Sequence, residues 1–148
     1  MNLEVKVTID APVAAVWERI TDIENAVENI EAIEEIEILE KPDSGLVGLK
    51  WRETRTVFGK KATEVMWVTE AKENELYRTR AESHGCIYIS SLGVSESDDG
   101  TSLTMSHETQ PQAFMAKIMA PLMGLLFKGA FCKMIRKDLE DLKKGLEG

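Results

Sequence analysis

Residues 113–146 read AFMAKIMAPLMGLLFKGAFCKMIRKDLEDLKKGL, which predicts one long C-terminal helix. In its distal half, apolar residues recur at three- and four-residue intervals, at Cys132, Ile135, Leu139, Leu142 and Leu146. Lysine, arginine and glutamate fill the opposite positions, so this half is amphipathic. Only strands are predicted between the short N-terminal helices and this helix, and we expect the chain to be organised around it.

The upstream half of this helix has a different pattern. Ile118–Phe127 (IMAPLMGLLF) contains no polar residue, so we expect protein or a bound molecule to cover most of its sides. It is too short to span a bilayer, which needs about 20 apolar residues. Three methionines recur every four residues, at Met115, Met119 and Met123. With the small residues Gly124 and Gly129 they suit a cavity wall that adapts to its contents, although an ordinary core has the same pattern.

Pro121 interrupts this apolar run. A proline inside a helix removes the hydrogen bond to the carbonyl four residues earlier and crowds it, at a cost of about 3 kcal/mol unless the helix bends. We therefore expect Gln112–Leu146 to form the dominant helix, with a kink or a break near Pro121.

The composition predicts a single domain over residues 1–148, because this length can bury a core without staples. The net charge of -8 repels phosphate backbones and anionic lipids, so we expect no nucleic-acid partner and no stable membrane insertion. Two cysteines and two separated histidines form no zinc or disulfide framework, and we expect no metal and no cofactor. The N-terminus, MNLEVKVTID, lacks the apolar core of a signal peptide, which favours a cytoplasmic location. The sequence is compatible with a homodimer as well as a monomer.

The N-terminal residues predict a strand and two short helices. Apolar residues alternate from Leu3 to Ile9, as in a half-buried strand. Asp10 is positioned to cap a helix that has Pro12 in its first turn, and Thr21 and Asp22 can start a second one. The acidic stretch Glu28–Glu40 then alternates with isoleucine, which indicates a solvated strand face rather than a metal site.

Turn signals divide the middle of the chain into antiparallel hairpins. A two-residue turn at Gly59-Lys60 would pair Trp51 with Val68, Glu53 with Met66, Arg55 with Glu64 and Val57 with Ala62. It would also place Arg52 against Trp67 on the outer face. Turns at His84-Gly85 and Ser97–Gly100 pair Ala81 with Tyr88, Thr79 with Ser90, Tyr77 with Leu92, Leu92 with Met105 and Ser90 with His107. One face is then mainly apolar and should face the helix.

Polar residues interrupt this inward face in two places. Glu53, Arg55 and Glu64 form one group, in which Arg55 lies between two carboxylates. This group is either a structural ion-pair cluster or the site that orients the polar end of an apolar ligand. Thr79, Tyr88, Ser90 and His107 form the second group. His107 and Tyr88 are candidate catalytic residues, but a core histidine bonded to Ser90 or Thr79 explains the pattern better, because the sequence has no nucleophile elbow and no acid in register with His107.

The order of elements and several stretches resemble the START-like, helix-grip superfamily (SRPBCC), and within it the polyketide cyclase/dehydrase and lipid transport family. The matching stretches are IDAPVAAVWERITDIEN, VGLKWRETRTVFGKK, DDGTSLTM and PLMGLLFKGAFCKMIRKDLEDLKKGLE. The resemblance implies an α+β helix-grip fold: a curved seven-stranded antiparallel sheet around the long C-terminal helix, with two short helices after the first strand closing one end of a cavity. No catalytic motif comes with it.

Three functions are open. The first is binding or transport of a small hydrophobic or amphipathic ligand of lipid, polyketide or isoprenoid type. The second is a cyclase or dehydratase using acid and base groups, and the third is a protein-interaction module with a filled cavity. The predicted ligand-binding residues are Trp51, Glu53, Arg55, Glu64, Met66, Thr79, Tyr88, Ser90, Met105, His107, Met115, Met119, Met123 and Phe127.

Overall fold

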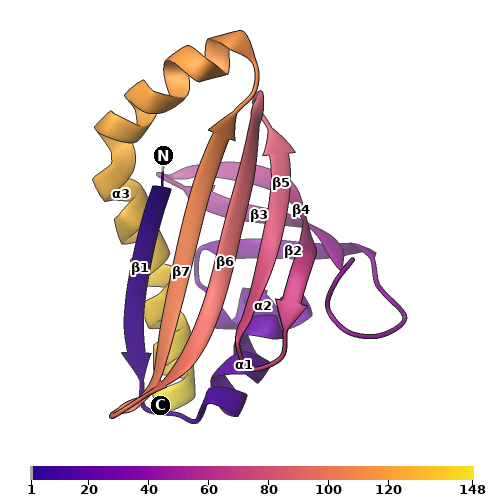
Figure 1. Cartoon of the computed structure of the whole chain (residues 1–148), viewed down its shortest axis with the longest axis vertical. Coiled ribbons are helices and arrows are strands. Elements are labelled where there is room, and N and C mark those ends of the chain that lie inside the picture. The colour runs from indigo at the N-terminus through magenta and orange to yellow at the C-terminus, as the bar shows by residue number, and fades with distance from the viewer. Residues whose placement is uncertain (1) are drawn as a thin grey trace.

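The computed structural model describes residues 2–148 as one α+β domain (Figure 1). The elements in chain order are β1 (Asn2–Ile9), α1 (Val13–Thr21), the 3-10 helix η1 (Ile23–Asn25), α2 (Ala26–Asn29), β2 (Ile33–Glu40), β3 (Lys50–Val57), β4 (Lys60–Lys72), β5 (Leu76–Ser83), β6 (Cys86–Ser97), β7 (Gly100–Pro111) and α3 (Phe114–Glu147). The predicted order of strand, short helices, six strands and one long helix is confirmed.

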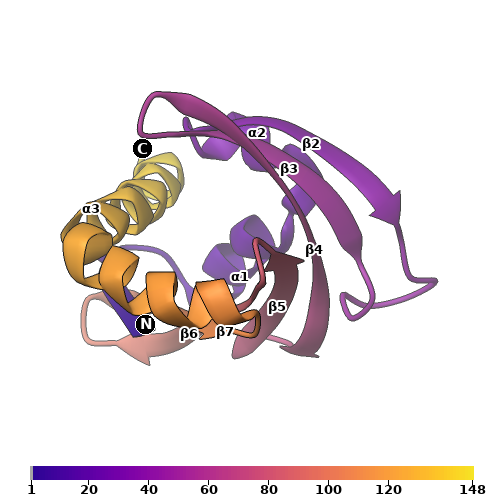
Figure 2. The ribbon, with the colours of Figure 1, turned by 90° about the horizontal axis from the view of Figure 1, so that it is seen from above.

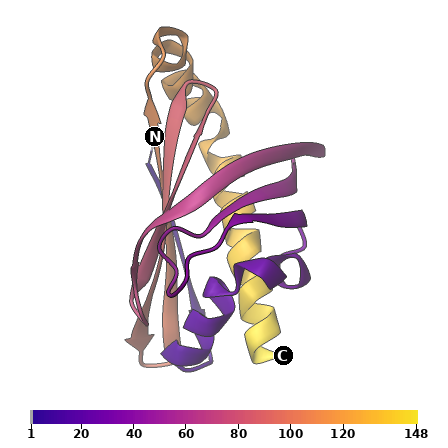
Figure 3. The ribbon, with the colours of Figure 1, turned by 90° about the vertical axis from the view of Figure 1, so that its right-hand side faces the viewer.

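All seven strands form one antiparallel sheet in the order β1-β7-β6-β5-β4-β3-β2. Figure 2 shows the sheet curving around the interior while α3 closes the side that the sheet leaves open. The short helices lie at one end of the molecule, beside the C-terminal half of α3, whereas α3 begins at the opposite end (Figure 3). This is the helix-grip arrangement.

Two of the three predicted hairpin registers are confirmed. Thr79 pairs with Ser90 across the His84-Gly85 turn, and Ser90 pairs with His107 across the turn after β6. The β3–β4 register is wrong by two residues, because Phe58 and Gly59 form the turn, with positive φ angles of 51° and 80°.

The corrected β3–β4 pairs are Trp51 with Met66, Glu53 with Glu64, Arg55 with Ala62 and Val57 with Lys60. A shift of two residues keeps every side chain on its predicted face, because side chains alternate with a period of two. The outer cation-π contact is made by Lys50, whose Nζ lies 5.8 Å from the Trp67 ring centroid, and not by Arg52. Arg52 instead donates to Glu37 at 2.6 Å.

Helix α3 runs unbroken from Phe114 to Glu147 with Pro121 inside it, so the predicted break is wrong. Figure 1 shows a bend between its N-terminal and C-terminal halves, which agrees with the alternative expectation of a kinked helix. The expectation that Ile118–Phe127 is covered by protein is wrong for this chain alone, because most of its large side chains are exposed.

The solid core lies between β1, β7, α1 and the C-terminal half of α3. Ile9, Val16, Leu103 and Leu139 are almost completely buried there. Thr101 on β7 donates to the Ala11 carbonyl at 2.6 Å, which ties the chain after β1 to the sheet. At the turn before Thr101, a side chain at Gly100 would come within 2.2 Å of the Ile9 carbonyl oxygen, so glycine is required.

The predicted cap of α1 is wrong. The helix starts at Val13 with Pro12 at the N-cap position, and no side chain caps it. Asp10 lies two residues before that position, and its backbone N–H donates to a carboxylate oxygen of Glu147 at 2.7 Å. The start of α1 is thus tied to the end of α3, which holds the short helices against the long one.

Candidate functional site

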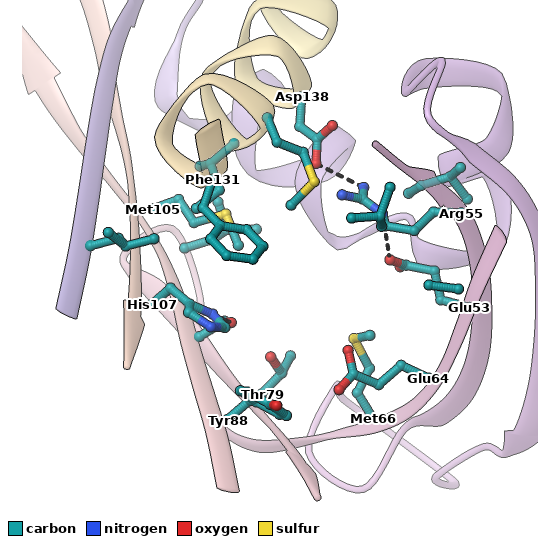
Figure 4. Close-up of a pocket in the computed structure, with 18 of the residues that line it drawn as sticks. Glu53, Arg55, Glu64, Met66, Thr79, Tyr88, Met105, His107, Phe131 and Asp138 are labelled. Carbon is teal, nitrogen blue, oxygen red and sulfur yellow. Dashed lines mark hydrogen bonds and ion pairs between the residues drawn. The ribbon is translucent and has the colours of Figure 1, made fainter. Parts of the chain in front are cut away.

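A cavity of about 660 Å³ lies between the sheet, the short helices and α3. Its wall is mainly apolar, with Met66 on β4, Met105 on β7 and Met123 and Phe131 on α3. Figure 4 shows several of these side chains around an open centre. The volume falls within the range of about 300 to 1,000 Å³ that small-molecule sites occupy.

The structure places twelve of the fourteen predicted ligand-binding residues on the cavity wall, namely Trp51, Glu53, Arg55, Glu64, Met66, Thr79, Tyr88, Ser90, Met105, His107, Met119 and Met123. Met115 and Phe127 do not line it, so their predicted place in the wall is wrong. Met115 is 63% exposed and Phe127 is 39% exposed, and at the start of the helix Ala116 lines the cavity instead of Met115. Ligand binding by the other twelve stays a prediction.

Arg55 is the centre of a buried charge cluster on the cavity wall. Its Nη2 donates to Asp138 Oδ2 at 2.7 Å, and its Nε lies 3.3 Å from Glu53 Oε2. The three side chains are only 12 to 16% exposed. Figure 4 shows them together on one side of the cavity. The prediction that Arg55 lies between two carboxylates is correct, but the second carboxylate is Asp138.

Glu64 was expected to be that second carboxylate. Its Oε1 instead accepts a hydrogen bond from Ser83 Oγ at 3.3 Å. The register correction explains the difference, since Glu64 pairs with Glu53 and not with Arg55 across β3 and β4. Asp138 was not among the predicted site residues, although its position in the sequence indicates that it is buried. It lies three residues after Ile135 and four before Leu142, so a carboxylate occupies the buried face of an amphipathic helix.

Burial is the main influence on the acids of this cluster. It raises the pKa of Glu53 and of Asp138, although Arg55 acts in the opposite direction on both. Burial also raises the pKa of Glu64. For Arg55, burial lowers the pKa, but Asp138 and Glu53 outweigh that effect and keep the guanidinium charged. The cluster therefore combines a fixed positive charge with carboxyl groups that take up a proton more readily than in water.

Two polar atoms of this cluster have no hydrogen-bond partner. Asp138 Oδ1 is buried and has none, and Arg55 Nε is buried and has only the ion-pair contact of 3.3 Å with Glu53 Oε2. Buried polar atoms are nearly always paired in proteins, so an incompletely satisfied cluster needs an explanation such as a functional role. A purely structural ion pair would be expected to satisfy these atoms.

His107 lies across the cavity from the charge cluster, together with Tyr88 and Thr79 (Figure 4). Its Nδ1 shares a hydrogen bond of 2.9 Å with Ser90 Oγ, and its ring stacks on Tyr88 with centroids 5.9 Å apart. Burial lowers the pKa of His107 and raises that of Tyr88 to about 12, so both are neutral at neutral pH. The predicted pairing of His107 with Ser90 is confirmed.

The described part of the chain, residues 2–148, contains no group of three His, Cys, Asp or Glu side chains placed to hold a metal ion. Cys86 and Cys132 are both free thiols. The polar groups of the cavity wall are two guanidinium groups, carboxyl groups, hydroxyl groups, an amide, a thiol and the imidazoles of His84 and His107.

The sequence agrees with this geometry. The family described as polyketide cyclase / dehydrase and lipid transport matches residues 1–147. The chain belongs to this family. The resemblance seen in the sequence is therefore confirmed over essentially the whole chain. No curated protein sequence matches it.

Solved structures show the same fold at low sequence identity. A START superfamily protein from Mycobacterium smegmatis superimposes with a TM-score of 0.73 at 16% identity, covering 98% of both chains. The Zhui aromatase/cyclase from Streptomyces sp. R1128 gives a TM-score of 0.76 at 17% identity, covering 99% of this family member and 93% of Zhui. The di-domain ARO/CYC BexL from the BE-7585A biosynthetic pathway gives 0.81 at 16% identity, covering 100% of this chain and 50% of BexL.

Proposed function

We propose that this family member binds a small amphipathic molecule in the cavity between the sheet and α3. One observation carries the proposal: a largely apolar space of about 660 Å³ has a buried, incompletely satisfied charge cluster on its wall. Apolar walls with a few converging polar groups are typical of sites that bind small molecules. The third open function, an interaction module with a filled cavity, fits less well because this space is not filled by side chains.

The charge cluster favours a neutral polar group on the ligand. Arg55 is already paired with Asp138 and Glu53, so a carboxylate on the ligand would lie next to two acids. A ketone, hydroxyl or phenol can exchange hydrogen bonds with these groups without adding charge to a buried site. Polycyclic ketones, quinones and flavonoids combine such groups with an apolar body that fits the methionine-rich wall.

A thermal-shift panel of quinones, flavonoids, sterols and fatty acids tests the proposal. A ligand that binds only the folded state at a hundredfold excess over Kd stabilises it by about 2.7 kcal/mol. We expect neutral compounds to raise Tm more than fatty acids, and native mass spectrometry of protein from its own host to show a co-purifying apolar compound.

A matched pair of variants shows where the compounds bind. Ala120 lines the cavity, whereas Leu125 on the same helix is 83% exposed. Ala120→Phe should fill the space and abolish the Tm shift, and Leu125→Phe should leave the shift unchanged. Equal shifts in both variants, or no shift with any compound, would contradict binding in the cavity.

Catalysis of ring closure is a second candidate, favoured by the raised pKa values of Glu53 and Asp138 beside Arg55. In an aldol condensation, one carboxylate can accept the proton from a carbon between two ketones, and Arg55 can stabilise the resulting enolate oxygen. The enolate carbon attacks the carbonyl carbon of a second ketone, whose π bond breaks and whose oxygen takes the proton held by the carboxylic acid. The regenerated carboxylate then removes the second proton from the same α-carbon and returns it to the hydroxyl group, which leaves as water while the carbon–carbon double bond forms. Structures similar to this chain include proteins named as aromatase/cyclases.

A linear poly-β-ketone thioester mimic distinguishes the two candidates. A cyclase would convert it to an aromatic product with a new ultraviolet absorbance, and Asp138→Asn would slow this conversion more than it weakens binding. Binding of the mimic without any change in product distribution would leave the protein as a binder.

A further inference from the structure

The N-terminal half of α3 exposes a continuous apolar surface. Six large side chains on it are 48 to 83% exposed: Phe114, Met115, Ile118, Leu122, Leu125 and Leu126. Their spacing of three and four residues places them on one face of the helix, which we name the α3 apolar face. Large exposed apolar patches on soluble proteins usually mark an interaction site.

The helix segment that carries this face has basic residues but no acidic ones. Residues 109–137 contain no aspartate or glutamate and carry five basic residues, Lys117, Lys128, Lys133, Arg136 and Lys137. Lys117 and Lys128 lie in the exposed half. Lys137, in contrast, is paired with Glu31 and Asp141. The whole chain nevertheless has a net charge of -8, so its acidic residues lie elsewhere. Fields at a surface act over a screening length of about 8 Å at physiological salt, so this local basic charge decides what can approach the face.

We propose that the α3 apolar face docks on the surface of a lipid bilayer that contains anionic lipids. Helices that combine exposed Phe and Leu side chains with neighbouring lysines lie in the interface of such membranes, with the apolar side chains among the upper acyl chains. The net charge of the whole chain predicts repulsion from anionic lipids. The charged residues of the N-terminal half of α3, however, are all basic, so we expect attraction at this end of the molecule.

The shape of the molecule allows this contact. Figures 1 and 3 show that α3 begins at one end of the domain, away from the short helices. The bend that Figure 1 shows in α3 separates the exposed N-terminal half from the half that packs in the core. A flat surface can therefore meet the N-terminal half without touching α1 or α2.

Docking on the surface fits better than crossing the membrane. By length and composition α3 could span a bilayer, and only 11% of its most apolar 18-residue stretch is buried. A core helix of a soluble protein can have the same length and composition, although it is mostly buried. The C-terminal half of α3, however, contributes Ile135, Leu139 and Leu142 to the core, and a spanning helix would have to leave the fold.

Docking on lipid also fits better than pairing with a second copy. In a symmetric dimer the same face meets itself, which would bring Lys117 and Lys128 of one copy close to those of the other. No acidic residue between 109 and 137 is available to compensate this repulsion. Anionic lipid headgroups compensate all of these charges.

The inner side of the same helix segment lines the cavity, through Ala116, Met119, Ala120 and Met123. One helix thus separates the cavity from the proposed lipid surface. If the cavity binds an apolar molecule, which rests on the proposed function, docking would place the ligand site beside the bilayer. The docking itself does not depend on a ligand and can be tested without one.

Cosedimentation of the full chain with vesicles provides the test. We expect binding to vesicles of phosphatidylcholine mixed with phosphatidylglycerol, and at least about tenfold weaker binding to phosphatidylcholine alone or at high salt. Leu125→Glu/Leu126→Glu should abolish binding. The control is Val47→Glu, which changes an exposed apolar residue outside α3 and should bind like the parent protein.

A second pair of variants tests the charges separately. Lys117→Glu/Lys128→Glu should weaken binding to anionic vesicles by at least about tenfold, whereas Lys72→Glu at the β4–β5 turn should not. Circular dichroism and Tm show that each variant is folded. Failure of the parent chain to bind anionic vesicles would overturn the proposal, as would a dimer in analytical ultracentrifugation that Leu125→Glu/Leu126→Glu disrupts while vesicle binding is absent.

Discussion

At the scale of single residues, the most informative interaction is the pairing of Arg55 with Asp138. The two residues are 83 positions apart in the sequence, and their side chains meet at 2.7 Å on the wall of the cavity. Removing one member of a buried pair leaves an uncompensated charge, which costs more than removing both. The pair therefore makes distinct predictions for single and double variants.

Asp138→Ala should destabilise the fold by about 3 kcal/mol, at the low end of the range for buried pairs because water in the cavity can approach Arg55. The double variant Arg55→Met/Asp138→Ala should lose less than the sum of Arg55→Met and Asp138→Ala, but it should not regain the parent stability, because Glu53 also loses its partner. Urea denaturation of the two single variants and the double variant measures the coupling. Arg52→Ala is a suitable control, since its exposed pair with Glu37 is worth at most about 1 kcal/mol. Additive losses in the cycle would mean that the two side chains are not coupled.

His107 predicts a pH dependence of stability. Its pKa in the folded protein is lower than the unfolded value of about 6.5, because burial favours the neutral ring. The folded state therefore binds fewer protons than the unfolded state in this range. The contribution of His107 to stability is complete above about pH 6.5 and is lost as pH falls through the lower folded pKa.

The comparison of parent protein and His107→Gln isolates this effect, because the other titrating groups are common to both. The measured quantity is the free energy of unfolding of the parent minus that of the variant. This difference should become smaller as the pH is lowered from about 7.5 to about 5.5. Urea denaturation at several pH values gives the difference. A constant difference across this range would show that His107 keeps its ordinary pKa.

At the scale of elements, α3 consists of two halves with different roles. The C-terminal half packs its apolar side chains into the core, while the N-terminal half forms a cavity wall on one side and the exposed apolar face on the other. The C-terminal half is not confined to the core. Leu139 is 1% exposed and belongs to the core, but it also borders the cavity.

The two halves should respond differently to truncation. Leu139→Ala should destabilise the fold by about 2 to 5 kcal/mol, as deletions in a packed core do. Met119→Ala should cost far less, because Met119 is 43% exposed and otherwise borders open space. A denaturant series on both variants makes the comparison. Similar losses would show that the N-terminal half of α3 is packed as tightly as the C-terminal half.

At the scale of the whole molecule, the curved sheet and α3 enclose more space than their side chains fill. The tip of the β3–β4 hairpin meets α3 through Phe58 and Phe131, whose ring centroids are 5.4 Å apart. Phe131 also lines the cavity, whereas Phe58 is 57% exposed. These two rings therefore cover part of the cavity toward solvent.

Phe58→Asn should speed the release of a bound compound from the panel by about two- to tenfold, which corresponds to the loss of one aromatic pair. Asparagine adopts positive φ angles readily in such turns, so the hairpin itself should remain intact. Stopped-flow measurement of dissociation gives the rate. Phe58→Tyr keeps the ring and should release the compound at the parent rate. Equal release rates for the parent and both variants would show that the compound does not leave past Phe58.

The sequence by itself determined the elements and their faces, because these depend on local periodicity. The alternation of apolar residues predicted the strands, and the spacing of Ile135, Leu139 and Leu142 predicted the buried side of α3. The β3–β4 register was wrong because phenylalanine rarely has a positive φ angle, which hid the Phe58-Gly59 turn. The inward face was still correct, since a shift of two residues does not exchange the faces of a strand.

Only the tertiary structure decided which side chains meet and what remains exposed. Asp138 rather than Glu64 pairs with Arg55 because the curvature of the sheet brings β3 to the inner face of α3. The packing of the elements also left Met115 and Phe127 outside the cavity and the α3 apolar face uncovered. An apolar sequence pattern states that a surface avoids water, whereas the packing of distant elements determines whether protein covers that surface.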